Sequence, residues 1–159
     1  MEYLFFDIDG VLNTGIHSNP NIICNMEKEF DEPLNEYREH NRALEQSSEY
    51  QSILPEVEKE VYTRFVNAKI EYSELYLARE NAEDDSVLPT LHKSLRESTE
   101  KKLNEAKRLM PDNPEQAAQL FMQLGSCHTL WAIQKQILKE KYGITWYTPA
   151  ELHPDVLFD

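Results

Sequence analysis

The chain has 159 residues, of which 40% are hydrophobic and 28% charged, and its formal net charge is -13. This length is typical of one domain with a real core, so we expect a single domain over residues 1–159. Because affinity for phosphate backbones comes largely from Lys and Arg, the acidic balance argues against direct binding to nucleic acid or to an anionic membrane, and it favours a basic partner or a metal ion. No apolar run is as long as a membrane span and no signal-peptide pattern follows Met1, so we expect a cytoplasmic protein.

The first predicted element is a short strand that ends at two carboxylates. An apolar run from Tyr3 to Phe6 is followed by Asp7, Asp9 and Gly10, a pattern typical of a buried strand that opens into a polar loop. Two carboxylates this close repel each other unless they share a proton or a divalent cation. Magnesium is the natural candidate, because it takes hard oxygen ligands and keeps room for a phosphate oxygen.

The segment FFDIDGVLN at residues 5–13, preceded by Tyr3 and Leu4, resembles the first motif of the haloacid-dehalogenase superfamily of phosphohydrolases. The resemblance implies that Asp7 is the nucleophile that forms an aspartyl-phosphate, and that Asp9 is the general acid and base. It also implies that the side chain of Asp7 and the backbone carbonyl of Asp9 hold magnesium, and that the substrate is a phosphorylated small molecule. The resemblance covers about a tenth of the chain.

A loop and a first helix follow the strand. Residues 14–25 are rich in turn formers and predict a loop, in which His17 either faces a phosphate or is simply solvated. From Met26 the pattern becomes helical up to about Ser48, with Pro33 in the first turn. The helical stripe of this segment consists of Leu34, Tyr37, Asn41 and Leu44.

A stronger helix is predicted from Pro55, with an apolar face wide enough to lie buried in a bundle. The acidic run at residues 83–86 predicts a solvated turn and a cap for the next helix. That helix begins at Pro89 and carries a weaker apolar stripe as far as Met110. The stronger face consists of Val57, Val61, Tyr62, Phe65, Val66, Ala68, Ile70, Tyr72, Leu75 and Leu77; the weaker stripe consists of Leu91, Leu95, Leu103, Ala106 and Met110.

The last long helix is predicted to run from the cap Asn113 to Gly143 without interruption. Its stripe, which includes Phe121 and Leu124, places His128 in or near the core. Cys127 is adjacent to His128 and therefore diverges from it by about 100° around the helix, which makes the two a poor metal pair. With Cys24 it forms no CxxC motif, so we expect free thiols in a reducing compartment.

The tail, residues 144–159, contains two runs that favour short strands. Residues 144–147 are aromatic and β-branched, and residues 155–159 form a second apolar run that can pair with Tyr3 to Phe6. Between them, Thr148 to Glu151 has the form of a capping box for a short helical turn. The sequence therefore predicts a mainly α protein: a strand and motif loop over residues 1–25, a bundle of about four helices over residues 26–143, and a small β element made from the amino-terminal strand and the tail.

A haloacid-dehalogenase core needs several parallel strands that deliver a Ser or Thr, a Lys and a late acidic pair, and no residue of this chain can be assigned to those roles. Three interpretations follow: a shortened member that retains magnesium binding, an enzyme completed by a second protomer, or a helical protein whose first strand only resembles the motif. The sequence thus predicts a magnesium-dependent phosphohydrolase-like protein, incomplete or degenerate. The alternative is a non-enzymatic interaction protein whose acidic helical surface binds a basic partner, as a phage-type inhibitor that mimics nucleic acid does.

Overall fold

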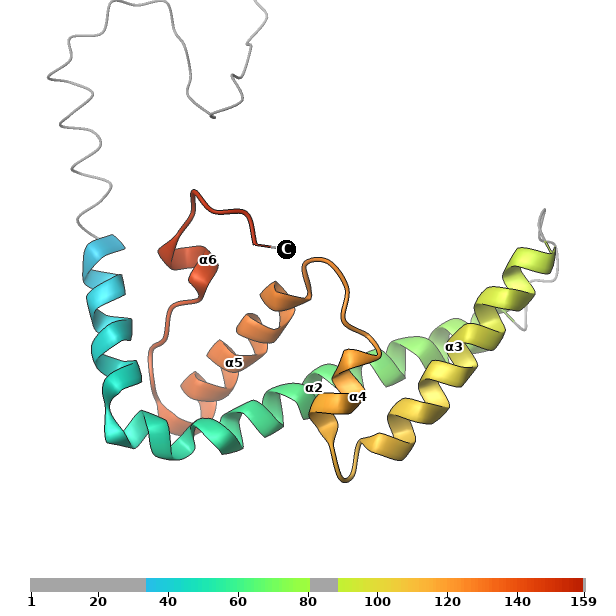
Figure 1. Ribbon diagram of the computed structural model, residues 1–159, viewed down its shortest axis with the longest axis horizontal. Helices are drawn as coiled ribbons and strands as arrows, with labels where there is room; N and C mark the ends of the chain where they lie inside the picture. The colour runs from blue at the N-terminus through green and yellow to red at the C-terminus, as the bar shows by residue number, and fades with distance from the viewer. Residues whose placement is uncertain (1–33, 81–88, 159) are drawn as a thin grey trace, which may run out of the picture. The chain divides into compact units, whose positions relative to one another are not determined.

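The computed structural model describes residues 34–80 and 89–158, and this part of the chain forms helices and no strand (Figure 1). The predicted mainly α fold is therefore confirmed, and Tyr37–Asp159 form a compact unit. The single domain over residues 1–159 stays a prediction, because residues 1–33 lie outside the described part. A first helix covers residues 34–46, and the later ones are α2 (Ser48–Glu80), α3 (Pro89–Leu109), α4 (Pro114–Gln119), α5 (Ser126–Tyr142) and α6 (Pro149–Leu152). Of these described helices, none is both long and apolar enough to cross a membrane.

The chain changes direction sharply at Ser47, between the first helix and α2 (Figure 1). The Ser47 hydroxyl donates a hydrogen bond to the Leu44 carbonyl at 2.6 Å and accepts one from the backbone N–H of Tyr50 at 3.2 Å. A serine that bonds to the backbone in this way ends one helix and caps the next. The predicted start at Pro55 was therefore wrong: Pro55 lies inside α2, where its missing N–H removes one backbone hydrogen bond without breaking the helix.

Two clusters of buried side chains lie along α2, which packs against α3, α4 and α5. The predicted apolar face is confirmed at its first positions, but it was wrong at Tyr72 and Leu75, which are 71% and 61% exposed. Among the described residues, both clusters reach α2 no further along than Ile70, so later positions with the same spacing enter neither cluster. The first cluster contains Tyr50, Val57, Val61, Ile137, Leu138 and Trp146; the second contains Phe65, Val66, Ala106, Ala117 and Ala118.

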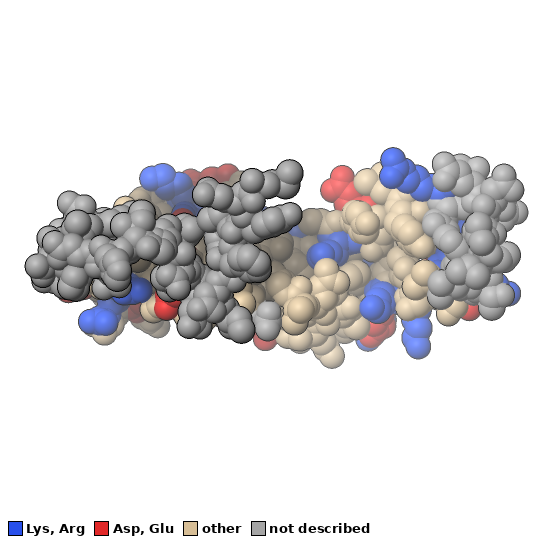
Figure 2. Space-filling view, turned by 90° about the horizontal axis from the view of Figure 1, so that it is seen from above, with Lys and Arg blue, Asp and Glu red and all other residues tan. Residues whose placement is uncertain are grey.

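The negative charge of the chain is concentrated outside these helices. Residues 34–80 and 89–158 contain eighteen acidic and fifteen basic residues, whereas residues 1–33 and 81–88 contain ten acidic residues and one basic residue. On the face drawn in Figure 2, basic side chains are interspersed with acidic ones. The helical surface is therefore nearly balanced in charge, and the acidity that favoured a basic partner belongs mainly to residues 1–33 and 81–88.

The predicted uninterrupted helix from Asn113 to Gly143 was wrong, because residues 120–125 divide it into α4 and α5. The start is as predicted: the Asn113 side chain accepts a hydrogen bond from the N–H of Gln116 at 2.9 Å. Gly125 then adopts a left-handed φ of 78° immediately before α5. This break lets α4 bury Ala117 and Ala118 in the second cluster while α5 packs in the first, which a single straight helix cannot do.

The tail forms no strand over residues 144–158, so the two strands predicted there were wrong for the described residues. The capping box is confirmed: Thr148 accepts a hydrogen bond from the N–H of Glu151 at 3.2 Å, and Glu151 accepts one from the N–H of Thr148 at 2.8 Å. The predicted pairing with Tyr3 to Phe6 has its partner strand outside the described part of the chain.

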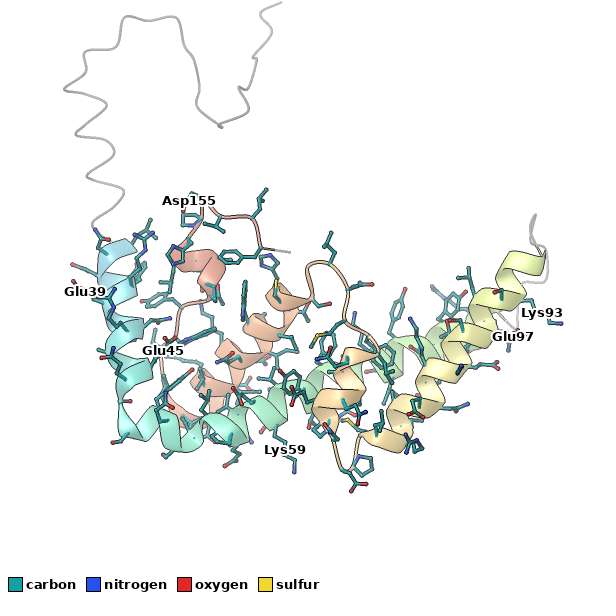
Figure 3. All side chains as sticks on the ribbon, in the orientation of Figure 1. Glu39, Glu45, Lys59, Lys93, Glu97 and Asp155 are labelled. Carbon is teal, nitrogen blue, oxygen red and sulfur yellow. The ribbon has the colours of Figure 1, made fainter. Side chains whose placement is uncertain are left out.

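Side chains of the first helix take the place that a partner strand would have beside the tail. The Asn41 amide donates to the Tyr147 carbonyl at 2.7 Å and accepts from the Tyr147 N–H at 3.1 Å. Glu45, labelled in Figure 3, accepts a hydrogen bond from the indole of Trp146 at 3.1 Å. Asn41 is buried within an otherwise apolar stripe because its amide satisfies both backbone groups of Tyr147.

Candidate functional site

The predicted catalytic and metal-binding residues, Asp7 and Asp9, lie outside the described residues, as do His17 and Cys24. Within residues 34–80 and 89–158, no group of three or more His, Cys, Asp or Glu side chains is placed to share a metal ion. The nucleophile, the general acid and the magnesium site therefore stay predictions from the sequence.

His128 was predicted to lie in or near the core, and this was wrong, because its side chain is exposed. The break at Gly125 places His128 in the first turn of α5, where it is exposed. Its Nε2 lies 3.1 Å from the carbonyl oxygen of Phe158, and its ring packs edge-on against Trp131 with centroids 5.3 Å apart. His128 therefore fastens the last described residues to α5, while the neighbouring Cys127 is a half-buried free thiol, as predicted.

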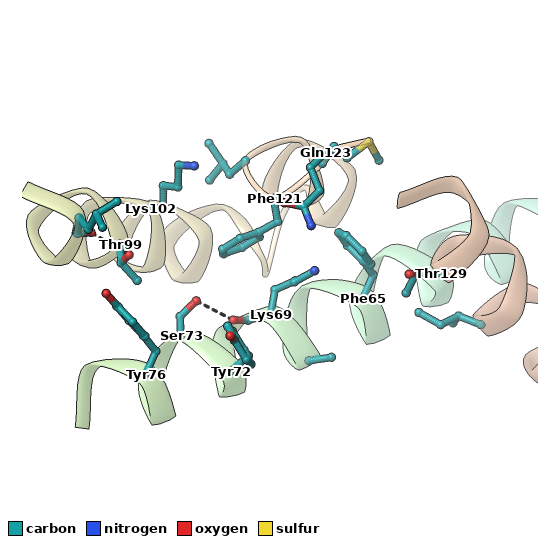
Figure 4. Close-up of a pocket in the computed structure, with 15 residues that line it drawn as sticks. Phe65, Lys69, Tyr72, Ser73, Tyr76, Thr99, Lys102, Phe121, Gln123 and Thr129 are labelled. Atoms are coloured by element: carbon teal, nitrogen blue, oxygen red, sulfur yellow. Dashed lines mark hydrogen bonds between the residues drawn. The ribbon is translucent and has the colours of Figure 1, made fainter. Parts of the chain in front are cut away.

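A hollow between α2 and α3, which also reaches the connection from α4 to α5, is the strongest candidate for a binding site (Figure 4). It encloses about 800 Å³ and is called the α2–α3 groove below. Its wall on α2 is formed mainly by Phe65, Lys69, Tyr72 and Tyr76. Its wall on α3 is formed by Leu95, Thr99 and Lys102.

The spacing of these residues explains why they share one groove. Residues three or four positions apart lie on the same side of a helix, so the α2 positions from Phe65 to Tyr76 form one continuous row. At a rise of about 1.5 Å per residue, this row is about 16 Å long. Sequence reasoning placed Phe65 and Tyr72 in one apolar face but missed the groove, because the same spacing describes a covered core and an uncovered wall.

The hydroxyl groups along the groove are partly used by their own helices. Ser73 donates a hydrogen bond to the carbonyl of Lys69 at 2.7 Å, and Thr99 donates one to the carbonyl of Leu95 at 2.9 Å. The ammonium of Lys69 lies 5.3 Å from the centre of the Phe65 ring, a cation–π contact. The two lysine ammoniums are the charged groups of the described lining, whereas the Ser73 and Thr99 protons are already engaged by their own helices.

The charge of the groove is opposite in sign to that of the whole chain. No side chain that lines it, among the described residues, is acidic. Neither Lys69 nor Lys102 forms an ion pair with any described carboxylate, whereas Lys107 nearby is paired with Glu74 at 2.5 Å. Within the described part of the chain, the groove therefore presents two uncompensated positive charges beside aromatic surface.

Two carboxyl groups with lowered pKa values lie in a different place, the junction of α2 with α5. A hydrogen bond from Lys141, together with one from Arg64, holds the pKa of the Glu60 carboxyl below its usual range. A hydrogen bond from Gln136, together with one from Arg64, lowers the pKa of Glu140. These groups join two helices on the surface, and we assign them to folding, although Gln136 and Glu140 also line a smaller hollow of about 530 Å³ beside Trp146.

The described walls of the α2–α3 groove are formed by aromatic and aliphatic side chains, hydroxyl groups, one amide and two lysines. Its described lining includes no His, Cys, Asp or Glu that would act as a nucleophile or general base. What it offers is apolar contact and two positive charges, which is the composition of a recognition surface. No protein-family model, curated protein or solved structure matches the chain.

Proposed function

We propose that this protein is an interaction protein, and that it works by binding a partner in the α2–α3 groove. One observation carries the proposal: aromatic side chains and two lysines line one groove that contains no described acidic residue, in a chain with a net charge of -13. An exposed tyrosine ring gains stability when a partner covers it, and the lysines select a partner of negative charge.

This proposal takes up the non-enzymatic interaction protein that the sequence offered as the alternative, but the partner at this site carries negative instead of positive charge. The groove favours an acidic ligand. Binding of a basic partner, or mimicry of nucleic acid, was predicted for an acidic helical surface and stays a prediction; most of the excess negative charge belongs to segments 1–33 and 81–88.

A small anionic aromatic probe, 8-anilinonaphthalene-1-sulfonate, tests whether the groove binds as proposed. We expect saturable binding at one site, measured by the rise in dye fluorescence. Lys102→Glu should weaken it roughly fivefold, the equivalent of about 1 kcal/mol for one exposed charge. Tyr72→Ala should also weaken it, because the ring forms part of the apolar wall.

Two matched controls are present in the chain. Lys101→Glu changes the net charge equally on the same helix, and Leu75→Ala removes another largely exposed apolar side chain of α2, but neither residue lines the groove. Binding that responds equally to Lys101→Glu and Lys102→Glu would show that only the overall charge matters. That result, or the absence of a saturable site, would overturn the proposal.

Phosphohydrolase activity at Asp7 and Asp9 is the second candidate, favoured by the sequence of residues 5–13. It ranks second because residues 34–80 and 89–158 are helical or irregular, which leaves residues 1–33 and 81–88 to supply parallel strands. The test is hydrolysis of an aryl phosphate with and without magnesium, beside Asp7→Asn. Magnesium-dependent turnover that this substitution abolishes would establish the activity. Equal hydrolysis rates for the unchanged chain and Asp7→Asn, together with no magnesium binding in calorimetry, would rule it out.

A further inference from the structure

We infer that the α2–α3 groove binds an acidic amphipathic helix of a partner protein. This inference rests on the proposed function and names the occupant. It follows from three properties of the groove: its two helical walls, the apolar surface between them, and the lysines on both walls.

The walls of the groove match the geometry of a third helix. Tyr76 on α2 lies opposite Thr99 on α3, and Phe65 lies toward Phe121 (Figure 4). The lining residues of both helices follow helical spacing. A helix that lies in such a groove contacts it through apolar side chains at positions i, i+3 or i+4, and i+7. A row of about 16 Å accommodates roughly three turns of such a helix.

The apolar surface is suited to a helix with bulky anchor side chains. Leu120, Phe121 and Met122 from the connection after α4 line one end of the groove, and Ile133 of α5 lines it beside them. Methionine is flexible and adapts to ligands of different shape. Tyr72, 71% exposed, leaves a ring that only a bulky occupant covers.

The two lysines decide the charge of the occupant. Lys69 belongs to α2 and Lys102 to α3, so positive charge is present on both walls. A helix with Asp or Glu on both flanks of its apolar ridge places a carboxylate toward each wall, so it can pair with both ammoniums while its ridge covers the apolar lining. A basic helix is excluded at this site, because it would place like charges together.

A selection experiment on random peptides tests this inference. A display library of random 16-residue peptides is selected on the full chain, and binders that also bind a Lys69→Glu/Lys102→Glu double variant are discarded. We expect enriched peptides with apolar residues at i, i+3 or i+4, and i+7, and with Asp or Glu on the flanks. The best peptide is then synthesised, and its affinity is measured by fluorescence anisotropy.

The matched control is the double variant Lys59→Glu/Lys101→Glu, which changes the net charge equally outside the groove. Lys59 points away from the elements packed on α2, and Lys101 does not line the groove (Figure 3). We expect the groove variant to weaken peptide binding at least tenfold and the control variant to change it less than twofold. Circular dichroism should show equal thermal midpoints for the two variants and a gain of helix when the peptide binds.

The outcomes separate this inference from the proposed function. If the dye binds at the groove but no acidic periodic peptide is enriched, the site takes small anions and the inference fails alone. Enrichment of basic peptides, or of acidic peptides that bind without helical spacing, also overturns it. If the dye and the peptides both fail to distinguish the groove variant from its control, the proposed function fails as well.

Discussion

The two halves of α2 carry the same apolar spacing but differ in how far their side chains are exposed. In the first half, Val57 and Val61 are 1% and 6% exposed, because α5 and the tail cover them. In the second half, Tyr72 and Leu75 continue the same face but are largely exposed. Helical spacing therefore defines which side chains share a side, and the neighbours that reach that side decide whether it becomes core or binding surface.

The tail that covers the first half of α2 is held in place by hydrogen bonds from side chains of the first helix. Asn41 binds both backbone groups of Tyr147, His40 Nε2 lies 2.8 Å from the Thr145 carbonyl, and Tyr37 stacks on the Tyr147 ring at 4.2 Å. These contacts hold residues 144–147 beside the first cluster, where Trp146 becomes buried. The described residues at the far end of α2 provide no comparable segment.

Removing the Trp146 side chain, which packs beside the first half of α2, should cause the largest loss of stability. Trp146→Ala deletes a side chain that is 5% exposed and leaves a cavity in the first cluster, with an expected loss of about 3–5 kcal/mol in unfolding free energy. Urea unfolding followed by circular dichroism measures this loss. Leu75→Ala, the control in the second half of α2, should change the unfolding free energy by less than about 0.5 kcal/mol. Equal losses at the two positions would refute the contrast between the halves.

Asn41 tests whether side-chain hydrogen bonds hold the tail. Asn41→Ala leaves the N–H and carbonyl of Tyr147 without their partners, which should lower the unfolding free energy by about 1–3 kcal/mol. Amide hydrogen exchange at Tyr147 should accelerate in the variant, while exchange within α3 should keep its rate relative to global unfolding. An unchanged exchange rate at Tyr147 would mean that packing alone places the tail.

Gly125 tests the break that separates the two clusters. Gly125→Ala should lower the unfolding free energy by about 1–2 kcal/mol, because a residue with a Cβ is strained at a φ of 78°. No atom lies within 4 Å of the position that the added Cβ would take, so backbone strain is the whole effect. Gly125→Asn should lose less, since asparagine tolerates this conformation. A more stable alanine variant with higher helix content would indicate that α4 and α5 can fuse.

The smallest expected effect concerns pH and the junction of α2 with α5. Because the pKa of Glu60 is lowered on folding, its stabilisation is present above the unfolded pKa, near 4.5, and is lost as pH falls through the lower folded value. We expect about 0.2–1 kcal/mol per exposed ion pair, seen as a smaller acid-induced loss of stability in Glu60→Gln. Glu58→Gln serves as the control, and an identical pH profile in both variants would contradict the assignment.

Much of the helical content was predictable from local signals. Asn113 with Pro114 and the capping box at Thr148 mark helix starts that the structure confirms, because each supplies hydrogen bonds or backbone angles that a helix terminus needs. The start at Pro55 was misread, because a proline inside a helix and one in its first turn look alike in a sequence. Gly125 was passed over because one glycine in a periodic stretch does not by itself end a helix.

The groove was not predictable, for a physical reason. Phe65 and Tyr72 occupy equivalent positions on one helix, and only the placement of the neighbouring helices buries the first and exposes the second. Lys69 and Lys102 come from different helices and have no pattern in common, so their approach to one groove required the tertiary structure.

The sequence by itself determined where α4 and α6 begin and which side of the first part of α2 is apolar, because caps, prolines and helical spacing act over a few residues. The tertiary structure alone decided which apolar positions are covered, how Asn41 replaces a strand partner, and where the two groove lysines meet the tyrosines of α2. Those features depend on contacts between residues far apart in the chain, and the free energy of such contacts is set by the neighbours that folding brings together.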